Sequence, residues 1–180
     1  FIGHKAGQEN TDGSNNVALG HSALNSSISG NSNVAIGALS GASATGYSNT
    51  FLGHASGLNN LTGANNVFLG AFSGFNEGGS DKLYISNSAD NTPLLYGEFD
   101  KNKLTINDTL STERLYITEG ATDGYLLRSN SSGRASWVNP TSVFNNHWSI
   151  LGDNIYKNNT GNVGIGTTTP SEKLEVVGNI

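Results

Sequence analysis

Cysteine and methionine are both absent from this chain of 180 residues. Without cysteine, the chain forms no disulfide bond and no thiolate metal site. Charge is also sparse, because Asp, Glu, Lys and Arg together make up only 13% of the residues and the formal net charge is −5. A chain without a basic patch is a poor ligand for DNA or RNA. We therefore expect no nucleic acid partner.

Long apolar runs are missing as well. No segment approaches the ~20 consecutive apolar residues that a membrane-spanning helix needs, so we expect no membrane insertion. The chain instead contains 24 glycines and 25 asparagines, and both residue types tolerate the positive φ angles of tight turns. This composition predicts an all-β fold with many turns and little helix.

A short apolar segment that ends in glycine recurs through the first 75 residues. Consecutive copies of this glycine are 17, 17, 16 and 17 residues apart, and a fixed period of this size indicates a solenoid. Each copy places a turn rich in Gly, Ser and Asn before three residues of strand character. The sequence therefore predicts a parallel β-roll, or solenoid, of ~17-residue repeats across residues 1–75. The five apolar-glycine pairs are Ile2-Gly3, Leu19-Gly20, Ile36-Gly37, Leu52-Gly53 and Leu69-Gly70.

Each three-residue strand has two faces, because side chains alternate along a strand. We expect the first and third residues to fill the interior of the roll. The second residue is apolar too, and a roll this thin encloses little volume, so we expect it to pack on identical chains in a homotrimer. Phe51→Asp or Phe68→Asp should then disrupt assembly. The predicted interior residues are Val17, Leu19, Val34, Ile36, Thr50, Leu52, Val67 and Leu69, and the predicted interchain residues are Phe1, Ala18, Ala35, Phe51 and Phe68.

The repeat itself resembles a known family. The runs Asn15-Asn16-Val17-Ala18-Leu19-Gly20 and Ser32-Asn33-Val34-Ala35-Ile36-Gly37 are similar to the repeat of trimeric autotransporter adhesin heads of the YadA-like type. The period here is longer than in that family. The resemblance implies a left-handed parallel β-roll that trimerises and binds host surfaces.

The second part of the chain has a different composition. Only three of the 23 charged residues lie before residue 76, which predicts a boundary near residues 76–80. We expect a β-sheet module over residues 76–120 and a module of hairpins over residues 121–180 that leads to a further C-terminal region. Predicted strands cover residues 82–86, 92–99, 103–106, 114–118, 125–128, 134–138 and 173–177.

This second part also resembles a family. The segments Asp81–Ile85, Asp123–Leu127, Asn162–Gly166 and Lys173–Val176 are similar to fibre proteins of tailed phages, contractile injection systems and large bacterial surface proteins. The resemblance implies a β-rich trimeric shaft of short sheets and hairpins. In that family such a shaft often precedes a C-terminal intramolecular chaperone.

Two groups of side chains are candidates for surface binding. His4, His21 and His54 each follow a repeat glycine, so they stack in one column, where they either hold a ligand or stay solvated. Tyr125, Trp137 and Trp148 either form a platform for sugars or fill the scant core. We expect no catalytic residue, no cofactor and no metal.

These patterns together predict a non-enzymatic, homotrimeric, extracellular fibre that attaches to a cell surface. The most favoured setting is a tail fibre of a phage or contractile injection system; a cell-anchored bacterial adhesin and a glycan-degrading spike enzyme are the alternatives. Expected partners are further copies of the chain, a cell-surface glycan or protein receptor, and a baseplate or other fibre component.

Overall fold

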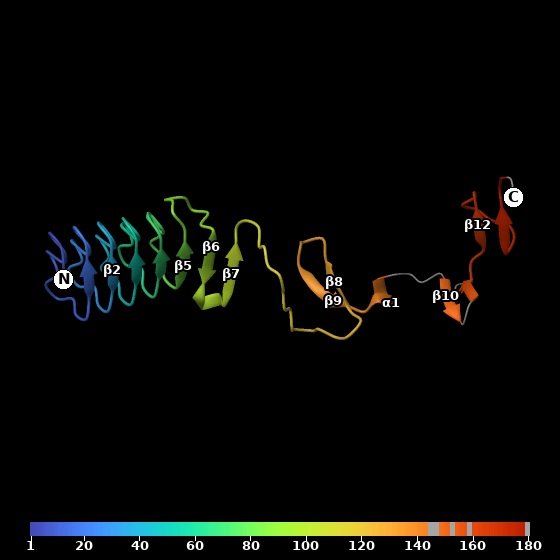
Figure 1. The fold of residues 1–180 in the computed structure, drawn as a ribbon, viewed down its shortest axis with the longest axis horizontal. Helices are drawn as coiled ribbons and strands as arrows, with labels where there is room; N and C mark the ends of the chain where they lie inside the picture. Colours follow the sequence, from blue (N-terminus) through green and yellow to red (C-terminus); the bar gives the residue numbers. More distant parts are fainter. Residues whose placement is uncertain (144–147, 152–153, 158–159, 179–180) are drawn as a thin grey trace. The chain divides into compact units, whose positions relative to one another are not determined.

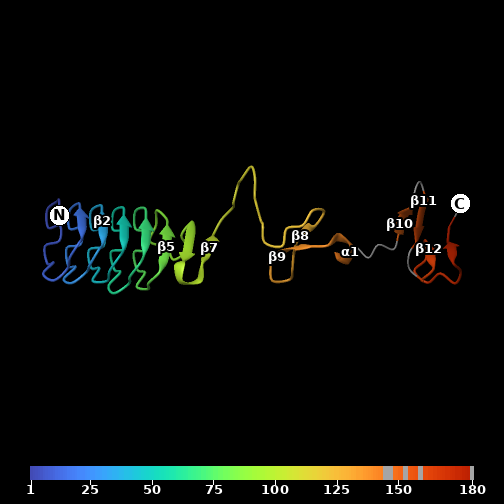
Figure 2. The same cartoon turned by 90° about the horizontal axis from the view of Figure 1, so that it is seen from below.

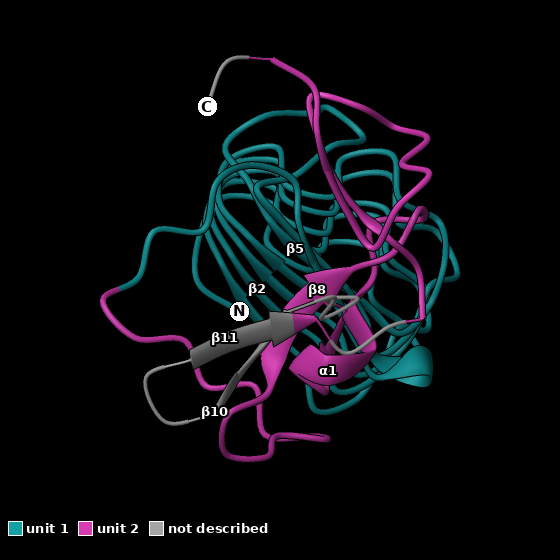
Figure 3. Cartoon of the chain, turned by 90° about the vertical axis from the view of Figure 1, so that its right-hand side faces the viewer, with its two compact units in different colours: residues 1–112 teal, residues 113–180 magenta. Residues whose placement is uncertain are grey.

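The computed structural model describes residues 1–143, 148–151, 154–157 and 160–178. The chain divides into two compact units, Phe1–Thr112 and Glu113–Ile180, coloured separately in Figure 3. Each unit is almost entirely β-structure, as the composition predicts.

Unit 1 is a β-solenoid that ends in a small antiparallel sheet. Figures 1 and 2 show its successive turns stacked side by side, from blue at the N-terminus to green. One strand from each turn joins a single seven-stranded sheet in the order β1 to β7, in which β1 to β5 are parallel and β5 to β7 antiparallel. The predicted solenoid is thus confirmed. Its elements are β1 (Val17–Leu19), β2 (Val34–Ile36), β3 (Thr50–Leu52), β4 (Val67–Leu69), β5 (Lys82–Ile85), β6 (Leu95–Glu98), the short 3-10 helix η1 (Phe99–Lys101) and β7 (Lys103–Ile106).

The interior of the solenoid is built around a column of side chains from the middle of each strand. Ala18, Ala35, Phe51 and Phe68 are at most 1% exposed, and Tyr84 extends the column into β5. Neighbouring rings lie close, with centroids 5.5 Å apart for Phe51 and Phe68 and 5.3 Å apart for Phe68 and Tyr84. Aromatic pairs at such distances contribute beyond the area that they bury.

The opposite wall of the coil is shaped to fit this column. Gly57 and Gly74 have positive φ angles of 62° and 59°, and a Cβ atom on them would lie 2.4 Å and 2.5 Å from the rings of Phe51 and Phe68. Leu24 is fully buried at the equivalent wall position, beside the two turns whose inward residue is alanine. Large residues on one wall of the interior therefore face small residues on the other.

A ladder of buried asparagines connects the turns where each strand begins. The Oδ1 atom of Asn49 accepts a hydrogen bond from the backbone N–H of Asn66 at 3.0 Å, and its Nδ2 atom donates to the carbonyl of Gly63 at 2.8 Å. Buried backbone groups need such partners, because leaving one unpaired costs roughly 1–3 kcal/mol. The same pattern is made by Asn16, Asn33 and Asn66.

The antiparallel strands replace this ladder with an ion cluster. Lys82 takes the next position after Asn66, and its ammonium lies 3.6 Å from the carboxylate of Glu98. Lys101 and Lys103 donate to the same carboxylate. The hydrogen bond from Lys101, with a further one from Lys103, lowers the pKa of Glu98 to about 2. Glu98 is 8% exposed, so this cluster is part of the folded end of the sheet.

The Glu98 cluster predicts acid sensitivity. Because the folded-state pKa lies below the ordinary value of 4.5, the cluster stabilises unit 1 fully above about pH 4.5 and loses this effect as the pH falls toward about 2. Glu98→Gln should lower the midpoint of urea unfolding at pH 7 and flatten its pH dependence between pH 4.5 and 2. Asp90→Asn, which changes an exposed carboxylate between β5 and β6, should do neither. Equal acid profiles for wild type and Glu98→Gln would contradict this role.

The structure overturns the predicted assignment of the two strand faces. Val17, Leu19, Leu52 and Leu69 are 40–51% exposed and point out of the solenoid, whereas the middle residues point in. The same holds for Val34, Ile36 and Val67, which are half-buried on the outer side. Alternation separates two faces but does not say which is inside when both are apolar. The prediction that Ala18, Ala35, Phe51 and Phe68 pack between chains is therefore wrong, and so is the prediction that Thr50, which is exposed, fills the interior.

The change in composition near residues 76–80 does not interrupt unit 1. Strand β5 pairs in parallel with β4, Val67 opposite Leu83, and the sheet runs on to Ile106. The boundary between the two units lies instead between residues 112 and 113 of the chain. Residues 114–118, predicted to extend the sheet as a strand, have no strand structure.

Unit 2 consists of separate two-stranded sheets. Strands β8 and β9 form the predicted antiparallel hairpin, and β12 and β13 pair in parallel. Among the described residues of this unit whose burial is known, none is buried. The elements are β8 (Leu126–Ser129), β9 (Ala135–Val138), α1 (Pro140–Val143), β10 (Trp148–Leu151), β11 (Asn154–Lys157), β12 (Val163–Ile165) and β13 (Leu174–Val176).

Candidate functional site

The main candidate surface is the outward side of the seven-stranded sheet, which we call the outer face. In β1 to β4 its positions hold only Val, Leu, Ile and Thr, without a charge. The register carries the face on through Leu83 and Ile85 of β5 to β6 and β7. Seven strands at ~4.8 Å spacing make the face ~30 Å long. The outer face comprises Val17, Leu19, Val34, Ile36, Thr50, Leu52, Val67, Leu69, Leu83, Ile85, Leu95, Leu104 and Ile106.

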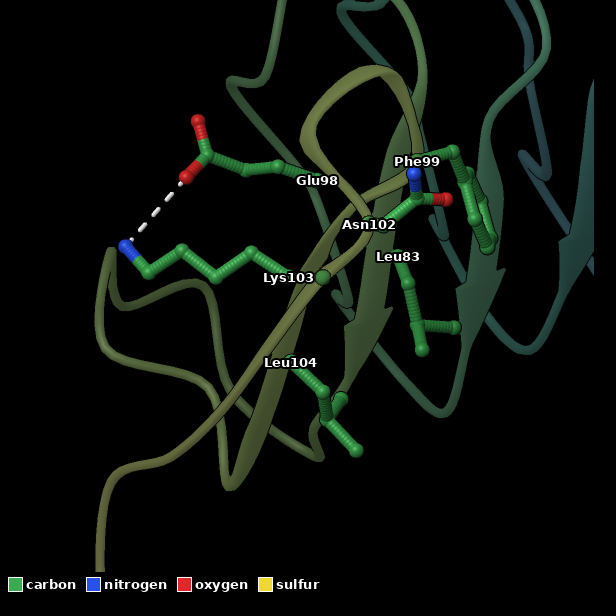
Figure 4. A pocket seen from close by; sticks show the side chains of 7 residues that line it. Leu83, Glu98, Phe99, Asn102, Lys103 and Leu104 are labelled. Carbon is green, nitrogen blue, oxygen red and sulfur yellow. Dashed lines mark hydrogen bonds and ion pairs between the residues drawn. The ribbon is translucent and has the colours of Figure 1, made fainter. Parts of the chain in front are cut away.

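The outer face is hollowed over its antiparallel part. Gly97 lies between Leu83 and Leu104 in the register and leaves a hollow of about 280 Å³, which Phe99 and Asn102 also line (Figure 4). In the same view Glu98 and Lys103 point toward one another. A second hollow of about 350 Å³ includes Leu69, Ile85 and Leu94. Both are shallow and mostly apolar, which suits the side chains of a packed neighbour more than a charged substrate.

The predicted histidine column exists on the solenoid surface. His4 and His21 are stacked with ring centroids 5.2 Å apart, and His54 contacts the ring of Phe72 edge-on at 5.1 Å. All three histidines are exposed. In the described part of the chain, no group of three or more His, Asp or Glu side chains is placed to hold a metal ion.

The three predicted aromatic residues of unit 2 have separate positions. Tyr125 is half-buried just before β8, and Trp137 is half-buried on β9, where its indole N–H donates to the carbonyl of Ile117 at 2.9 Å. Trp148 begins β10, and its side chain lies outside the described residues. The indole of Trp137 thus holds the preceding segment against the hairpin.

Sequence reasoning missed an aromatic group at one corner of the solenoid. Phe72 and Phe75, in the turn after β4, have ring centroids 5.9 Å apart, and Phe72 also contacts His54 of the turn below. The available signal was a departure from the repeat, because the equivalent positions in the other turns carry no aromatic residue.

The comparisons with known proteins give no assignment: no family model, no curated protein and no solved structure matches this chain. Among the residues that the structure describes, no helix has the length and apolar character to cross a membrane.

Proposed function

We propose that this chain is the protomer of a homotrimeric, non-enzymatic, extracellular fibre that attaches to a cell surface. The observation that carries the proposal is that no residue of unit 2 is buried among those whose burial the structure describes. Within its described residues, strands form regularly, yet apolar side chains such as Tyr116 and Leu174 are 77% and 63% exposed.

Strands without an interior need partners. An isolated two-stranded hairpin is only marginally stable in water, and independent stability requires further strands or a packed apolar face. Leu126 and Leu127 of β8 are 41% and 43% exposed, and Ile165 of β12 is 57% exposed. Equivalent residues of neighbouring chains, wound together, supply the missing core.

The outer face of unit 1 supports the same conclusion. It is long, apolar and uncharged over β1 to β4, and exposed apolar patches of this kind mark interaction sites. Similar rungs repeat along it, so a parallel copy of the same chain presents a matching apolar residue at each level. Closed cyclic assembly covers such a face on every copy. The number three follows the resemblance to trimeric adhesin heads and fibre shafts.

A trimer of this kind provides reach and multivalent attachment. Three copies of a weak surface site on one rod gain avidity through effective concentration, by factors of ~10² to 10⁴. The setting that we favour is a tail fibre of a phage or contractile injection system, in which a baseplate or another fibre component would be a further partner. A cell-anchored adhesin would gain avidity from three copies of the site in the same way.

The molar mass in solution tests the assembly. Light scattering coupled to size-exclusion chromatography should give three times the chain mass of 18.7 kDa across the elution peak. We also expect the part of the β-strand circular dichroism that comes from unit 2 to be lost in a concentration-dependent transition, because unit 2 folds only with its partners. A stable monomer with folded unit 2 would refute the proposal.

A further inference from the structure

The turn after β4 departs from the repeat at two positions. Phe72 is the second residue after the repeat glycine, and Phe75 is the fifth. Among the five turns, only this one carries aromatic residues at both positions. The equivalents of Phe72 are Lys5, Ser22, Leu39 and Ala55, and the equivalents of Phe75 are Gln8, Asn25, Ala42 and Leu58.

These rings form an exposed corner with the histidine of the preceding turn. Phe72 contacts both His54, at 5.1 Å, and Phe75, at 5.9 Å, and it remains 38% exposed. Its backbone φ of +60° is a feature of the repeat, because the equivalent residues of the other turns have φ angles of 52–60°; only the aromatic side chain is particular to this turn. Phe68, not Phe72, fills the interior at this level. The solenoid therefore presents the Phe72 ring to solvent without a matching gain in core packing.

An amide pair lies beside this corner. The Nδ2 atom of Asn59 donates to Oδ1 of Asn76 at 2.9 Å, and the backbone N–H of Asn59 donates to the carbonyl of Phe75 at 3.0 Å. Both asparagines are exposed. Since an amide group has two donors and an acceptor with two lone pairs, each keeps hydrogen-bonding capacity after this contact.

The corner contains no Asp, Glu, Lys or Arg side chain, and none occurs between His54 and Asn76 in the sequence. Glu77, the next residue, is engaged, because its carboxylate accepts hydrogen bonds from the Tyr84 hydroxyl at 2.7 Å and the Gly79 N–H at 2.7 Å. Aromatic faces beside uncharged amides favour a ligand with an apolar C–H face and many hydroxyl groups.

We propose that the corner of His54, Phe72 and Phe75, with Asn59 and Asn76, binds a pyranose unit of a neutral cell-surface glycan. The rings stack on the C–H face of the sugar, and the amides pair with its hydroxyl groups. This inference rests on the proposed attachment function and names its ligand class. The corner lies on a turn and not on the strands of the outer face, so it stays open when that face is covered. Each site is weak alone, and three on one fibre act together.

The test is binding of neutral sugars to the whole purified chain. The probes are the methyl pyranosides of glucose, galactose, mannose and N-acetylglucosamine, followed by an array of neutral oligosaccharides. Saturation transfer from protein to the sugar C–H protons should be strong for wild type. We expect Phe72→Ala and Phe75→Ala each to weaken oligosaccharide binding at least tenfold. The control is Tyr47→Ala, which removes another exposed aromatic ring, 57% exposed, from a different solenoid turn.

Three outcomes would overturn the glycan site: no neutral sugar binds, Phe72→Ala binds as well as wild type, or attachment to target cells survives enzymatic removal of their glycans, which would indicate a protein receptor. The molar mass of the same samples separates this result from the fibre proposal. A trimer that binds no sugar refutes the site alone. A monomer refutes the assembly, while its sugar binding still decides the site.

Discussion

Leu19→Asp combined with Leu52→Asp is expected to convert the trimer into single chains. Both leucines are 42% exposed on the outer face, so the carboxylates are tolerated in an isolated solenoid. In the proposed trimer they would be buried without a counter-charge, at an effective cost of several kcal/mol per ion. A trimer would carry six such charges in its interface, which strongly disfavours assembly through this face. Light scattering should report one chain mass, and circular dichroism should show that the strands of unit 1 remain.

The matched control adds the same charges elsewhere. Ile28→Asp combined with Leu61→Asp changes two apolar residues that are 49% and 58% exposed on turns of the solenoid, not on its strands. This variant should remain a trimer by light scattering. If both double variants stay trimeric, the outer face is not required for assembly, and the strands of unit 2 are sufficient to hold the chains together.

Phe68→Ala is expected to destabilise the solenoid itself. The Phe68 ring is fully buried between Phe51 and Tyr84, and Gly74 lies against it. Truncating a buried phenylalanine costs about 3–5 kcal/mol, because contacts are lost and a cavity remains. For a domain of marginal stability this is a large fraction of the total. The midpoint of urea unfolding, followed by circular dichroism, should fall steeply.

Phe72→Ala is the control for this second experiment. It removes the same side chain four residues along, from a ring that is 38% exposed, so the free energy of unfolding should change by about 1 kcal/mol or less. If Phe68→Ala instead dissociated the trimer and left unfolding unchanged, the middle strand residues would lie between chains and not inside the solenoid.

The sequence alone was sufficient to predict the solenoid and most of the turns between its strands. A period of 17 residues with glycine after each strand leaves few other ways to fold, since each copy buries its apolar residues only by stacking on the next. The hairpin of β8 and β9 was predictable for a local reason too, because Asn130 and Gly133 supply the turn between its strands. Residues 114–118 were not predictable in the same way, because a strand needs a partner as well as suitable residues.

The asparagine ladder shows a different limit. The sequence marks Asn33, Asn49 and Asn66 as turn residues, yet their side chains are buried and bridge consecutive turns. Asparagine suits a turn because it tolerates the backbone conformation there, and it suits a ladder because its amide group both donates and accepts hydrogen bonds. Only the stacking of the turns in the folded chain shows which role each asparagine has. The same is true of Phe72, whose contact with His54 depends on the alignment of two turns.

The sequence by itself determined the period, the positions of the strands and the excess of apolar residues over what one thin coil needs. Only the tertiary structure decided which side of each strand is inside, because alternation defines two faces and both are apolar. Side-chain volume determines which face is inside. The rings of Phe51 and Phe68 fit opposite Gly57 and Gly74, and the residues on either side of them in each strand remain on the outer face.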